Sequence, residues 1–309
     1  MSNQQPFLSV VIPMYNEEKG ITKLLNHLSI ILTERCPGMA YEIIVVDDGS
    51  NDGSAKAVKA VENQTIHLCQ HPYNIGNGAA VKTGMRKTQG EFILMMDADG
   101  QHKPEDIPRL LEHIDRYDMV VGARTKESDS AKHRDLANFI YNSFASYVCG
   151  RKIEDLTSGF RVIRADLAKQ MIYLLPNTFS YPTTITLAVV RSGYSLKYVP
   201  IVAPKRIGKS KIKLVRDGSR FLMILFKIAT LFSPLKIFVP ASLVVFLVGF
   251  FYGLFKVVFL GSRYGPTSAL LMTMGGMIFL IGLISEQIAY LRFDRSEFID
   301  SSLRKQSDA

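Results

Sequence analysis

Cysteine is scarce in this sequence, and its scarcity excludes two kinds of small stapled protein. The 309 residues contain three cysteines, which are Cys36, Cys69 and Cys149. An odd number of well-separated cysteines builds no disulfide framework, and three are too few for a four-cysteine zinc site. We therefore expect a chain that works in a reducing, cytosol-facing compartment and is stabilised by its own core, since 309 residues are enough for about two domains.

The common glycine-rich phosphate loops are also missing. Residues 13–17 follow the first predicted strand without the glycine fingerprint of dinucleotide-binding folds, and residues 76–78 lack its third glycine. Residues 208–210 read Gly-Lys-Ser but have no glycine five residues earlier, as a P-loop requires. A nicotinamide-dependent enzyme and a P-loop ATPase are therefore disfavoured. Residues 1–30 contain no charged segment followed by an apolar run, so we expect the front of the chain to stay in the cytosol.

Positive charge is concentrated in one segment. The net charge is +9, and residues 205–236 hold nine lysines and arginines against one acid, Asp217. Because this segment comes directly before a long apolar stretch, we interpret it as a surface for anionic lipid headgroups, with no nucleic-acid partner. Its Phe- and Leu-rich part, residues 213–236, is predicted to form juxtamembrane helices in the interface. The alternative, a solvated charged face, would leave those apolar side chains exposed.

Two long apolar runs predict a transmembrane hairpin. Residues 237–260 and 267–291 each contain one charged residue, Lys256 and Glu286 respectively, and each is long enough to cross a hydrocarbon core of ~30 Å. The connector 261–266 is short and turn-forming, so both ends of the hairpin should lie on one side. Lysine and arginine are enriched outside both ends, which favours the cytoplasmic side. The two charged residues either snorkel near helix ends or form an intramembrane polar pair.

The part before residue 205 alternates short apolar runs with helix-like stretches, which predicts a mostly parallel α/β sheet. The predicted strands are residues 8–13, 41–46, 66–70, 92–96 and 119–121. The predicted helices are residues 17–34, 79–88 and 104–116. Ligands bind such sheets at the carboxyl ends of the strands, so the polar residues directly after each strand are candidate site residues.

Two acidic clusters fall at such strand ends. One, residues 47–53, follows the second predicted strand, and the other follows the fourth. In the latter, Asp97 and Asp99 stand one residue apart and Gln101 comes two residues later, which supplies the hard oxygen ligands that Mg²⁺ or Mn²⁺ prefers. The alternative is that these side chains only cap turns and helices. His102 is a further candidate ligand, but we favour a turn residue because Lys-Pro follows it.

Four motifs stand in order along the chain. They are Val10-Val-Ile-Pro-Met-Tyr-Asn-Glu17, Val46-Asp-Asp-Gly-Ser-Asn-Asp-Gly53, Asp97-Ala-Asp-Gly-Gln-His102 with Pro104-Glu105, and Leu156-Thr-Ser-Gly-Phe-Arg161. Over about residues 7–215 the sequence resembles family 2 glycosyltransferases, and among them the polyprenyl-phosphate (dolichol-phosphate) branch, which carries such a membrane hairpin. The resemblance implies a cytosolic GT-A domain, Rossmann-like with a mostly parallel sheet, over residues 1–212. It also implies a nucleoside diphosphate sugar as donor and a polyprenyl phosphate as acceptor.

The same resemblance implies roles for individual residues. The donor nucleotide would be bound by Pro13, Tyr15, Glu17, Asp48, Asp97, Arg206 and Lys211. The metal ion, Mg²⁺ or Mn²⁺, would be held by Asp97, Asp99 and Gln101. The acceptor phosphate would be bound by Arg124 and Arg134, which together with Asp99 are the implied catalytic residues. The loop that carries the fourth motif would be oriented by Asp155, Ser158 and Arg161.

The chemistry of the acceptor explains why arginines are expected where a base would otherwise be sought. Cleavage of the sugar–diphosphate bond builds negative charge, which a divalent cation and basic side chains neutralise. A phosphate monoester is already anionic at pH 7, so it needs arginines to hold it rather than a base, and in-line attack inverts the anomeric centre. A hydroxyl acceptor would instead require a carboxylate base, for which Asp155 is the candidate.

Three other interpretations stay open. They are a transferase to a hydroxyl-bearing lipid or glycan, a non-catalytic membrane scaffold of the same fold, and a processive polysaccharide synthase. The last is disfavoured because the chain has no tryptophan for the Gln-x-x-Arg-Trp segment of those enzymes, and two predicted spans. We expect a multi-pass protein of the cytoplasmic membrane with residues 292–309 as a cytosolic tail. A homo-oligomer, with a tetramer as one form, and a UDP-sugar rather than a GDP-sugar are expected by analogy; the sugar is not specified.

Overall fold

The computed structural model describes residues 6–125, 132–178, 181–203, 226 and 230–307, with the backbone alone for 132–138 and 292–307. These residues form two compact units. The first holds the described residues up to Ser146 and from Arg151 to residue 203, and the second holds Tyr147–Gly150 with the described residues from 226 onward. Most of the predicted interfacial segment, together with Arg206 and Lys211, lies outside the described residues.

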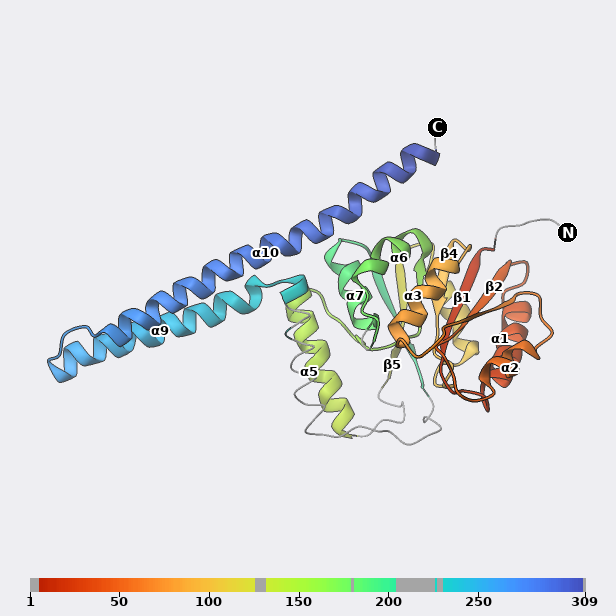
Figure 1. The fold of residues 1–309 in the computed structure, drawn as a ribbon, viewed down its shortest axis with the longest axis horizontal. Helices are drawn as coiled ribbons and strands as arrows, with labels where there is room; N and C mark the ends of the chain where they lie inside the picture. Colours follow the sequence, from red (N-terminus) through yellow and green to blue (C-terminus); the bar gives the residue numbers. More distant parts are fainter. Residues whose placement is uncertain (1–5, 126–131, 179–180, 204–225, 227–229, 308–309) are drawn as a thin grey trace. The chain divides into compact units, whose positions relative to one another are not determined.

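Strands and helices alternate along the first unit (Figure 1). In chain order they are β1 (Leu8–Met14), α1 (Ile21–Arg35), β2 (Tyr41–Asp47), α2 (Ser54–Lys59), β3 (Ile66–Gln70), α3 (Asn77–Lys87), β4 (Phe92–Met95), the 3₁₀ turn η1 (Pro104–Asp106), α4 (Ile107–Leu111), β5 (Met119–Arg124), α5 (Lys132–Cys149), β6 (Arg161–Arg164), α6 (Ala165–Met171), the 3₁₀ turn η2 (Ile172–Leu174), α7 (Tyr181–Arg191) and β7 (Leu196–Ile201). The last turn of α5 belongs to the second unit, which also contains α9 (Leu235–Leu260) and α10 (Pro266–Ser307).

The seven strands form one sheet in the order β3-β2-β1-β4-β6-β5-β7. All pairs are parallel except those of β6, which runs antiparallel to both β4 and β5. The prediction of a mostly parallel α/β sheet is therefore confirmed. Because β1 lies between β2 and β4, the loops that follow these three strands meet at one edge of the sheet. This edge carries both acidic clusters.

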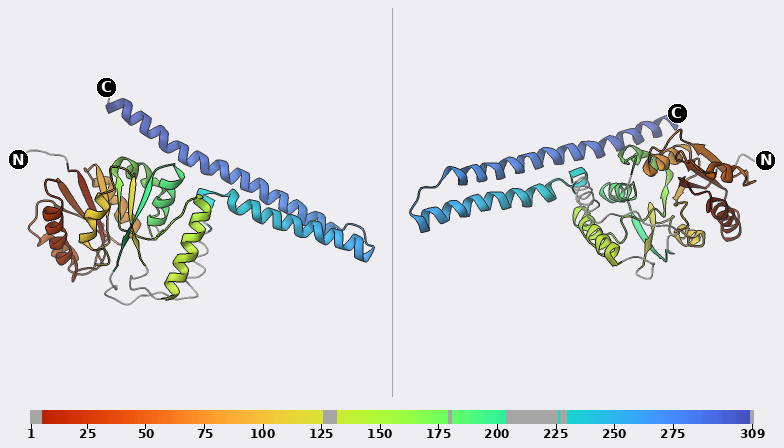
Figure 2. Two further views of the ribbon diagram at one scale, coloured as in Figure 1. Left: turned by 180° about the vertical axis from the view of Figure 1, so that it is seen from behind. Right: turned by 60° about the horizontal axis from the view of Figure 1, so that its bottom comes forward.

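Helices cover both faces of the sheet (Figures 1 and 2). The larger core forms where α1, α2 and α4 pack on the alternating side chains of β1, and it includes Leu25, Val58 and Leu110. Each fully buried leucine or valine in such a core contributes about 1.5–3 kcal/mol. On the other face, α3 lies so close to the sheet that a Cβ at Gly84 would overlap the side chain of Val11. Close helix–sheet packing therefore holds the strand ends in place.

The second unit is a helical hairpin. Helices α9 and α10 run side by side (Figures 1 and 2), and residues 235–260 and 266–291 are long and apolar enough to cross a membrane, with mean hydropathies of 2.5 and 2.0. Glycines allow the close approach of the two helices: a Cβ at Gly275 would lie 2.9 Å from Phe246 Cβ, and one at Gly282 would lie 2.5 Å from Phe238 Cβ. The predicted hairpin is thereby confirmed.

The charged residues of the hairpin have separate contacts. Glu286 is buried, and its Oε2 accepts a hydrogen bond from the backbone N–H of Leu235 at 3.1 Å, at the start of α9. Lys236 Nζ donates to the carbonyl of Val148 at 3.0 Å. At the other end of α9, Lys256 Nζ lies 5.5 Å from the centre of the Tyr252 ring. Two of these charged groups therefore satisfy backbone groups at helix ends.

Two predicted helices differ most in length from the observed ones. The helix predicted for residues 104–116 is a 3₁₀ turn followed by α4, which ends at Leu111 because the chain tightens into i→i+3 bonds such as Ile114 N to Leu111 O. The apolar run predicted to end at residue 291 continues as helix to Ser307. Residues 292–307 contain neither glycine nor proline, so no local signal stops α10 there.

Candidate active site

The loop after β4 places the two central carboxylates. Gly100 adopts a φ of +74°, which turns the chain sharply after Asp99. The backbone N–H of Gln101 donates to Asp99 Oδ1 at 3.1 Å, and the backbone N–H of Asp97 donates to His102 Nδ1 at 2.9 Å. The loop thus closes on itself and brings Asp97, Asp99 and Gln101 together within one turn. The side chain of Asp97 is 34% exposed, so a ligand can reach it.

His102 stands at a bend of this loop and also supports it. It is buried and stacks on Phe160, with the ring centres 5.1 Å apart. Burial lowers its pKa to about 4, which outweighs the opposite effect of Asp99, so the ring is neutral at pH 7. A neutral ring can accept the Asp97 N–H bond at Nδ1. Only the surrounding fold shows this role, because a single histidine before Lys-Pro does not indicate from the sequence whether its side chain is buried.

The residues of this loop fit a hard divalent cation. Carboxylate and amide oxygens are the ligands that Mg²⁺ and Mn²⁺ prefer. In the described part of the chain, no three or more His, Cys, Asp or Glu side chains gather as a closed metal cage. Two carboxylates and one amide, those of Asp97, Asp99 and Gln101, lie on this one loop, and their oxygens are of the kind that such an ion binds together with the oxygens of a diphosphate. This is the donor set expected where the ion and a nucleotide bind together.

A second chain segment crosses close to Asp97. A Cβ at Gly159 would lie 2.9 Å from Asp97 Oδ2 and 3.1 Å from Tyr181 Oη, so the glycine allows both oxygens to approach one point of the backbone. Tyr181 is only 2% exposed, and its hydroxyl has no hydrogen-bond partner among the described residues. Burial and the nearby Asp97 carboxylate raise the pKa of Tyr181, so it stays protonated. We did not predict this tyrosine, since it lies outside the four motifs.

Arg124, at the end of β5, is held by Asp155. The guanidinium donates from Nε to Asp155 Oδ2 at 2.8 Å and from Nη2 to Oδ1 at 2.9 Å. Burial favours the neutral forms of both groups, but their mutual attraction is stronger, so the pKa of Asp155 is lowered and that of Arg124 is raised. Both therefore stay charged. The Arg124 side chain is 35% exposed, which leaves part of it accessible to an anion.

The loop of residues 155–161 is held by its own side chains. Asp155 Oδ1 accepts hydrogen bonds from the backbone N–H of Thr157 and of Ser158, each at 3.1 Å. Ser158 Oγ donates to the carbonyl of Gly122 at 2.6 Å. The buried Arg161 donates from Nη2 to the carbonyl of Ser158 and from Nη1 to Thr186 Oγ1 at 2.9 Å. These contacts fix the backbone that passes beside Asp97.

The loops after β1 and β2 are joined to each other. The backbone N–H of Asn16 donates to Ser50 Oγ at 2.9 Å, and that of Glu17 donates to Ser54 Oγ at 2.8 Å. Tyr15, between the strand end and these contacts, is 41% exposed. Pro13 lies inside β1, opposite Val46 of β2. The first two motifs thus form one continuous rim at the carboxyl edge of the sheet.

Asp48 is buried and shapes a neighbouring loop. Its Oδ1 accepts from the backbone N–H of Ile75 at 3.0 Å, and its Oδ2 accepts from that of Gly76 at 2.8 Å. His71, which we did not predict, connects Asp48 Oδ1 (2.8 Å) with Thr83 Oγ1 (2.9 Å). Both carboxylate oxygens of Asp48 are therefore engaged by the protein. Its predicted part in nucleotide binding stays a prediction.

The structure describes the side chains of most, but not all, of the predicted site residues. The residues whose side chains it places are Pro13, Tyr15, Glu17, Asp48, Asp97, Asp99, Gln101, Arg124, Asp155, Ser158 and Arg161. Arg134 is described only as a backbone position on α5. Arg206 and Lys211 lie outside the described residues.

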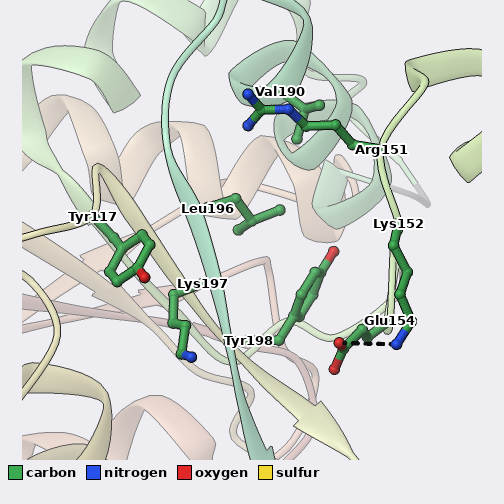
Figure 3. A pocket seen from close by; sticks show the side chains of 8 residues that line it. All are labelled: Tyr117, Arg151, Lys152, Glu154, Val190, Leu196, Lys197 and Tyr198. Atoms are coloured by element: carbon green, nitrogen blue, oxygen red, sulfur yellow. Dashed lines mark ion pairs between the residues drawn. The ribbon is translucent and has the colours of Figure 1, made fainter.

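A separate hollow lies beside the edge strand β7 (Figure 3). It has a volume of about 240 Å³, and its walls include Tyr117, just before β5, and Leu196 at the start of β7. Lys152 and Glu154, on its opposite wall, form an ion pair at 3.5 Å (Figure 3). It lies toward the amino ends of β5 and β7, whereas ligands of such sheets bind at the carboxyl ends. We therefore place the candidate active site at the acidic loop and not in this hollow.

A comparison with known families decides the classification. The model of the family described as "Glycosyl transferase family 2" matches residues 9–172, which is more than half of the chain. The chain belongs to glycosyl transferase family 2. A second model, described as the "GtrB C-terminal hairpin", matches residues 233–291. The resemblance stated from the four motifs is thus confirmed, and this family 2 glycosyltransferase carries the hairpin in addition to its catalytic domain.

Similar proteins extend over nearly the whole glycosyltransferase. An undecaprenyl-phosphate 4-deoxy-4-formamido-L-arabinose transferase of Klebsiella pneumoniae is 29% identical over 304 residues, covering 93% of this chain and 89% of that protein. The transferase of the same name from Yersinia pestis is 28% identical, covering 95% and 92%. Among solved structures, glucosyl-3-phosphoglycerate synthase of Mycobacterium tuberculosis in complex with Mn²⁺ and UDP-glucose aligns with a TM-score of 0.57 at 17% identity, covering 73% of this chain and 78% of that one. This likeness confirms the predicted GT-A fold.

Proposed function

We propose that this glycosyltransferase transfers a sugar from a nucleoside diphosphate sugar to the phosphate of a membrane polyprenyl phosphate, with inversion of the anomeric centre. Its full-length relatives are named as undecaprenyl-phosphate sugar transferases, which supports this acceptor. The solved structure with UDP-glucose supports a nucleotide sugar, and we favour UDP over GDP. The observation that carries the proposal is an acidic loop at the end of β4 whose Asp97 lies near enough to Arg124 to raise its pKa, in a chain with two candidate membrane helices.

The donor would be held at the loops after β1, β2 and β4. Asp97, Asp99 and Gln101 would hold Mg²⁺ or Mn²⁺, which would act as a Lewis acid on the diphosphate leaving group. Pro13, Tyr15 and the neighbouring Glu17 would contact base and ribose along the rim, and Asp48 would act through the loop of residues 75 and 76. Arg206 and Lys211 would reach the diphosphate. The relatives' complexes with Mn²⁺ support a divalent ion.

The acceptor phosphate would be bound by Arg124, with Arg134 of α5 as its partner. Because Asp155 holds Arg124 Nε and Nη2, the guanidinium is oriented before the acceptor arrives, and Nη1 can bind a phosphate oxygen. The buried Asp155 is already paired with an arginine, so it is poorly suited to act as a base. A phosphate monoester needs none, which favours this acceptor over a hydroxyl group.

The membrane arrangement follows from the same chemistry. A polyprenyl phosphate resides in the bilayer and a nucleotide sugar in the cytosol, so the catalytic domain, residues 1–212, would face the cytosol. Helices α9 and α10 would span the cytoplasmic membrane, residues 213–236 would lie in the interface, and residues 292–309 would return to the cytosol. We also propose a homo-oligomer, with a tetramer as the expected form.

The test uses the full-length protein in detergent with undecaprenyl phosphate and a panel of UDP- and GDP-sugars. We expect one new lipid whose mass equals undecaprenyl phosphate plus one sugar and which is lost on addition of EDTA. Asp99→Asn should abolish it, whereas Asp115→Asn, at an exposed position on the same domain, should not. Transfer to a hydroxyl-bearing lipid with no product on undecaprenyl phosphate would contradict the proposal.

A further inference from the structure

Tyr181 presents a buried hydroxyl that the structure leaves unsatisfied beside the acidic loop. It is the first residue of α7, is 2% exposed, and makes no hydrogen bond through Oη among the described residues. Buried polar groups in native proteins nearly always have a partner, so an exception calls for a ligand or another group that arrives later. A tyrosine hydroxyl can donate a hydrogen bond.

The position of this hydroxyl identifies the group that it can serve. Tyr181 Oη and Asp97 Oδ2 both lie about 3 Å from the point where a Cβ of Gly159 would stand. The neighbouring Arg161 donates from its two terminal nitrogens to the carbonyls of Ser158 and Pro182, and its Nε has no partner among the described residues. A guanidinium only donates, so it cannot accept a hydrogen bond from the tyrosine hydroxyl. The carboxylate of Asp97 is therefore an anionic acceptor that lies beside the Tyr181 hydroxyl, a donor without an acceptor among the described residues.

We propose that Tyr181 is a positioning residue of the donor site, whose hydroxyl donates a hydrogen bond to the Asp97 carboxylate, directly or through one water, once the donor nucleotide is bound. His102 already fixes the backbone of Asp97, and Tyr181 fixes the orientation of its carboxylate, so that the other oxygen faces the metal ion and diphosphate. Gly159 has no side chain because a Cβ would occupy the space across which the two oxygens meet. This inference rests on the proposed donor site and adds to it a residue outside the four motifs.

The test compares Tyr181→Phe with Tyr198→Phe in the full-length protein. Tyr198, on β7 in the wall of the separate hollow (Figure 3), also has a buried hydroxyl, which lies close to the backbone of Glu154 and not to the acidic loop, and it serves as the control. Binding of UDP, and in a parallel arm GDP, is measured by calorimetry with Mn²⁺ present. We expect Tyr181→Phe to raise the Kd of the nucleotide that wild type binds about 10-fold, as expected for one hydrogen bond to a charged group, and Tyr198→Phe to leave it within about twofold.

Thermal unfolding without ligand separates positioning from folding. Tyr181→Phe removes an oxygen that has no hydrogen-bond partner among the described residues, so the unfolding midpoint of the variant without ligand should equal or exceed that of wild type. The stabilisation of the variant by nucleotide and Mn²⁺ should be smaller than that of wild type. Gly159→Ala should weaken nucleotide binding at least as much, because the methyl group enters the space between the two oxygens.

Each contrary result has a distinct meaning. Unchanged nucleotide affinity in Tyr181→Phe, or in Gly159→Ala, overturns the inference and leaves the proposed function intact. A lower midpoint without ligand, or a failure to fold, in Tyr181→Phe shows a structural partner for the hydroxyl and also overturns the inference. Absence of nucleotide binding in wild type overturns the proposed donor site together with the inference.

Discussion

Replacement of Asp155 by asparagine tests the best-defined ionic contact of the site. Asp155 is 5% exposed and accepts hydrogen bonds from the backbone and side chain of Arg124 and from the backbone of Thr157 and Ser158. Asparagine keeps the shape but loses the charge and replaces one acceptor by a donor. Removal of one partner of a buried ion pair costs about 3–5 kcal/mol, and because water screens the partly exposed Arg124, we expect a loss of about 2–3 kcal/mol.

For a domain of this size that loss corresponds to a fall of about 5–10 °C in the midpoint of thermal unfolding. The sign of the pH dependence is also fixed. The pKa of Asp155 is lowered in the folded protein, so its contribution is present above the unfolded pKa of about 3.9 and is lost as the pH falls through the folded value. The difference between wild type and Asp155→Asn should therefore be full at pH 7 and shrink in acid.

The assay is thermal unfolding of the full-length protein in detergent between pH 3 and 7, with Glu154→Gln as control. Glu154 is the neighbouring carboxylate, 48% exposed, and among the described residues it forms an ion pair with the largely exposed Lys152. Its replacement should therefore change the midpoint by less than about 2 °C. A midpoint of Asp155→Asn equal to that of wild type at pH 7, or a difference that grows in acid, would refute the reasoning.

Three further predictions follow from other parts of the molecule. Arg124→Ala should lower kcat/KM for undecaprenyl phosphate about 10- to 150-fold, because charge-assisted hydrogen bonds to the acceptor are lost. Nucleotide affinity should change less than about threefold. Equal losses on both substrates would assign the arginine to the donor. Asp118→Asn should lower the unfolding midpoint at pH 7, because hydrogen bonds from Ser195 and the charge of Arg164 outweigh burial and hold the pKa of Asp118 below its ordinary value. The difference from wild type should fade below about pH 4. A difference that does not depend on pH would contradict this. Gly282→Leu should separate α9 from α10, since even a Cβ at this position would lie 2.5 Å from Phe238 Cβ. It should lower the unfolding midpoint more than Gly276→Leu, because a Cβ at Gly276 meets nothing within 4 Å. Equal midpoints of the two variants would argue against this packing.

The sheet was predictable as far as its strands were marked by apolar runs. The strands of residues 41–47 and 66–70 contain short apolar runs flanked by polar turns, and the structure places them within one residue of the prediction. β6 was not predicted, because Arg161–Arg164 is short and begins and ends with arginine. Its antiparallel direction depends on its neighbours β4 and β5, which no local pattern encodes.

The site was predictable in its residue types but not in its contacts. Spacing within one loop was enough to group Asp97 with Asp99, because neighbours in sequence stay neighbours in space. The approach of Gly159 and Tyr181 to that loop joins segments more than 60 residues apart, and it follows from the position of β6 next to β4. The support of Asp97 by His102 depends on burial, which a single residue does not reveal.

The charged groups of the hairpin have a consequence for the thickness of its surroundings. Lys236 and Lys256 on α9 are 20 residues apart, as are Pro266 and Glu286 on α10, and each interval of helix is ~30 Å long. At one end of the hairpin, Glu286 and Lys236 form hydrogen bonds with backbone groups, and these two charged residues define one boundary of the apolar interval. The connector between the two helices defines the other boundary. A markedly thicker bilayer would draw these charged groups into the hydrocarbon core, so the hairpin should resist movement along the membrane normal. The enzyme should therefore prefer membranes whose hydrocarbon thickness matches this interval.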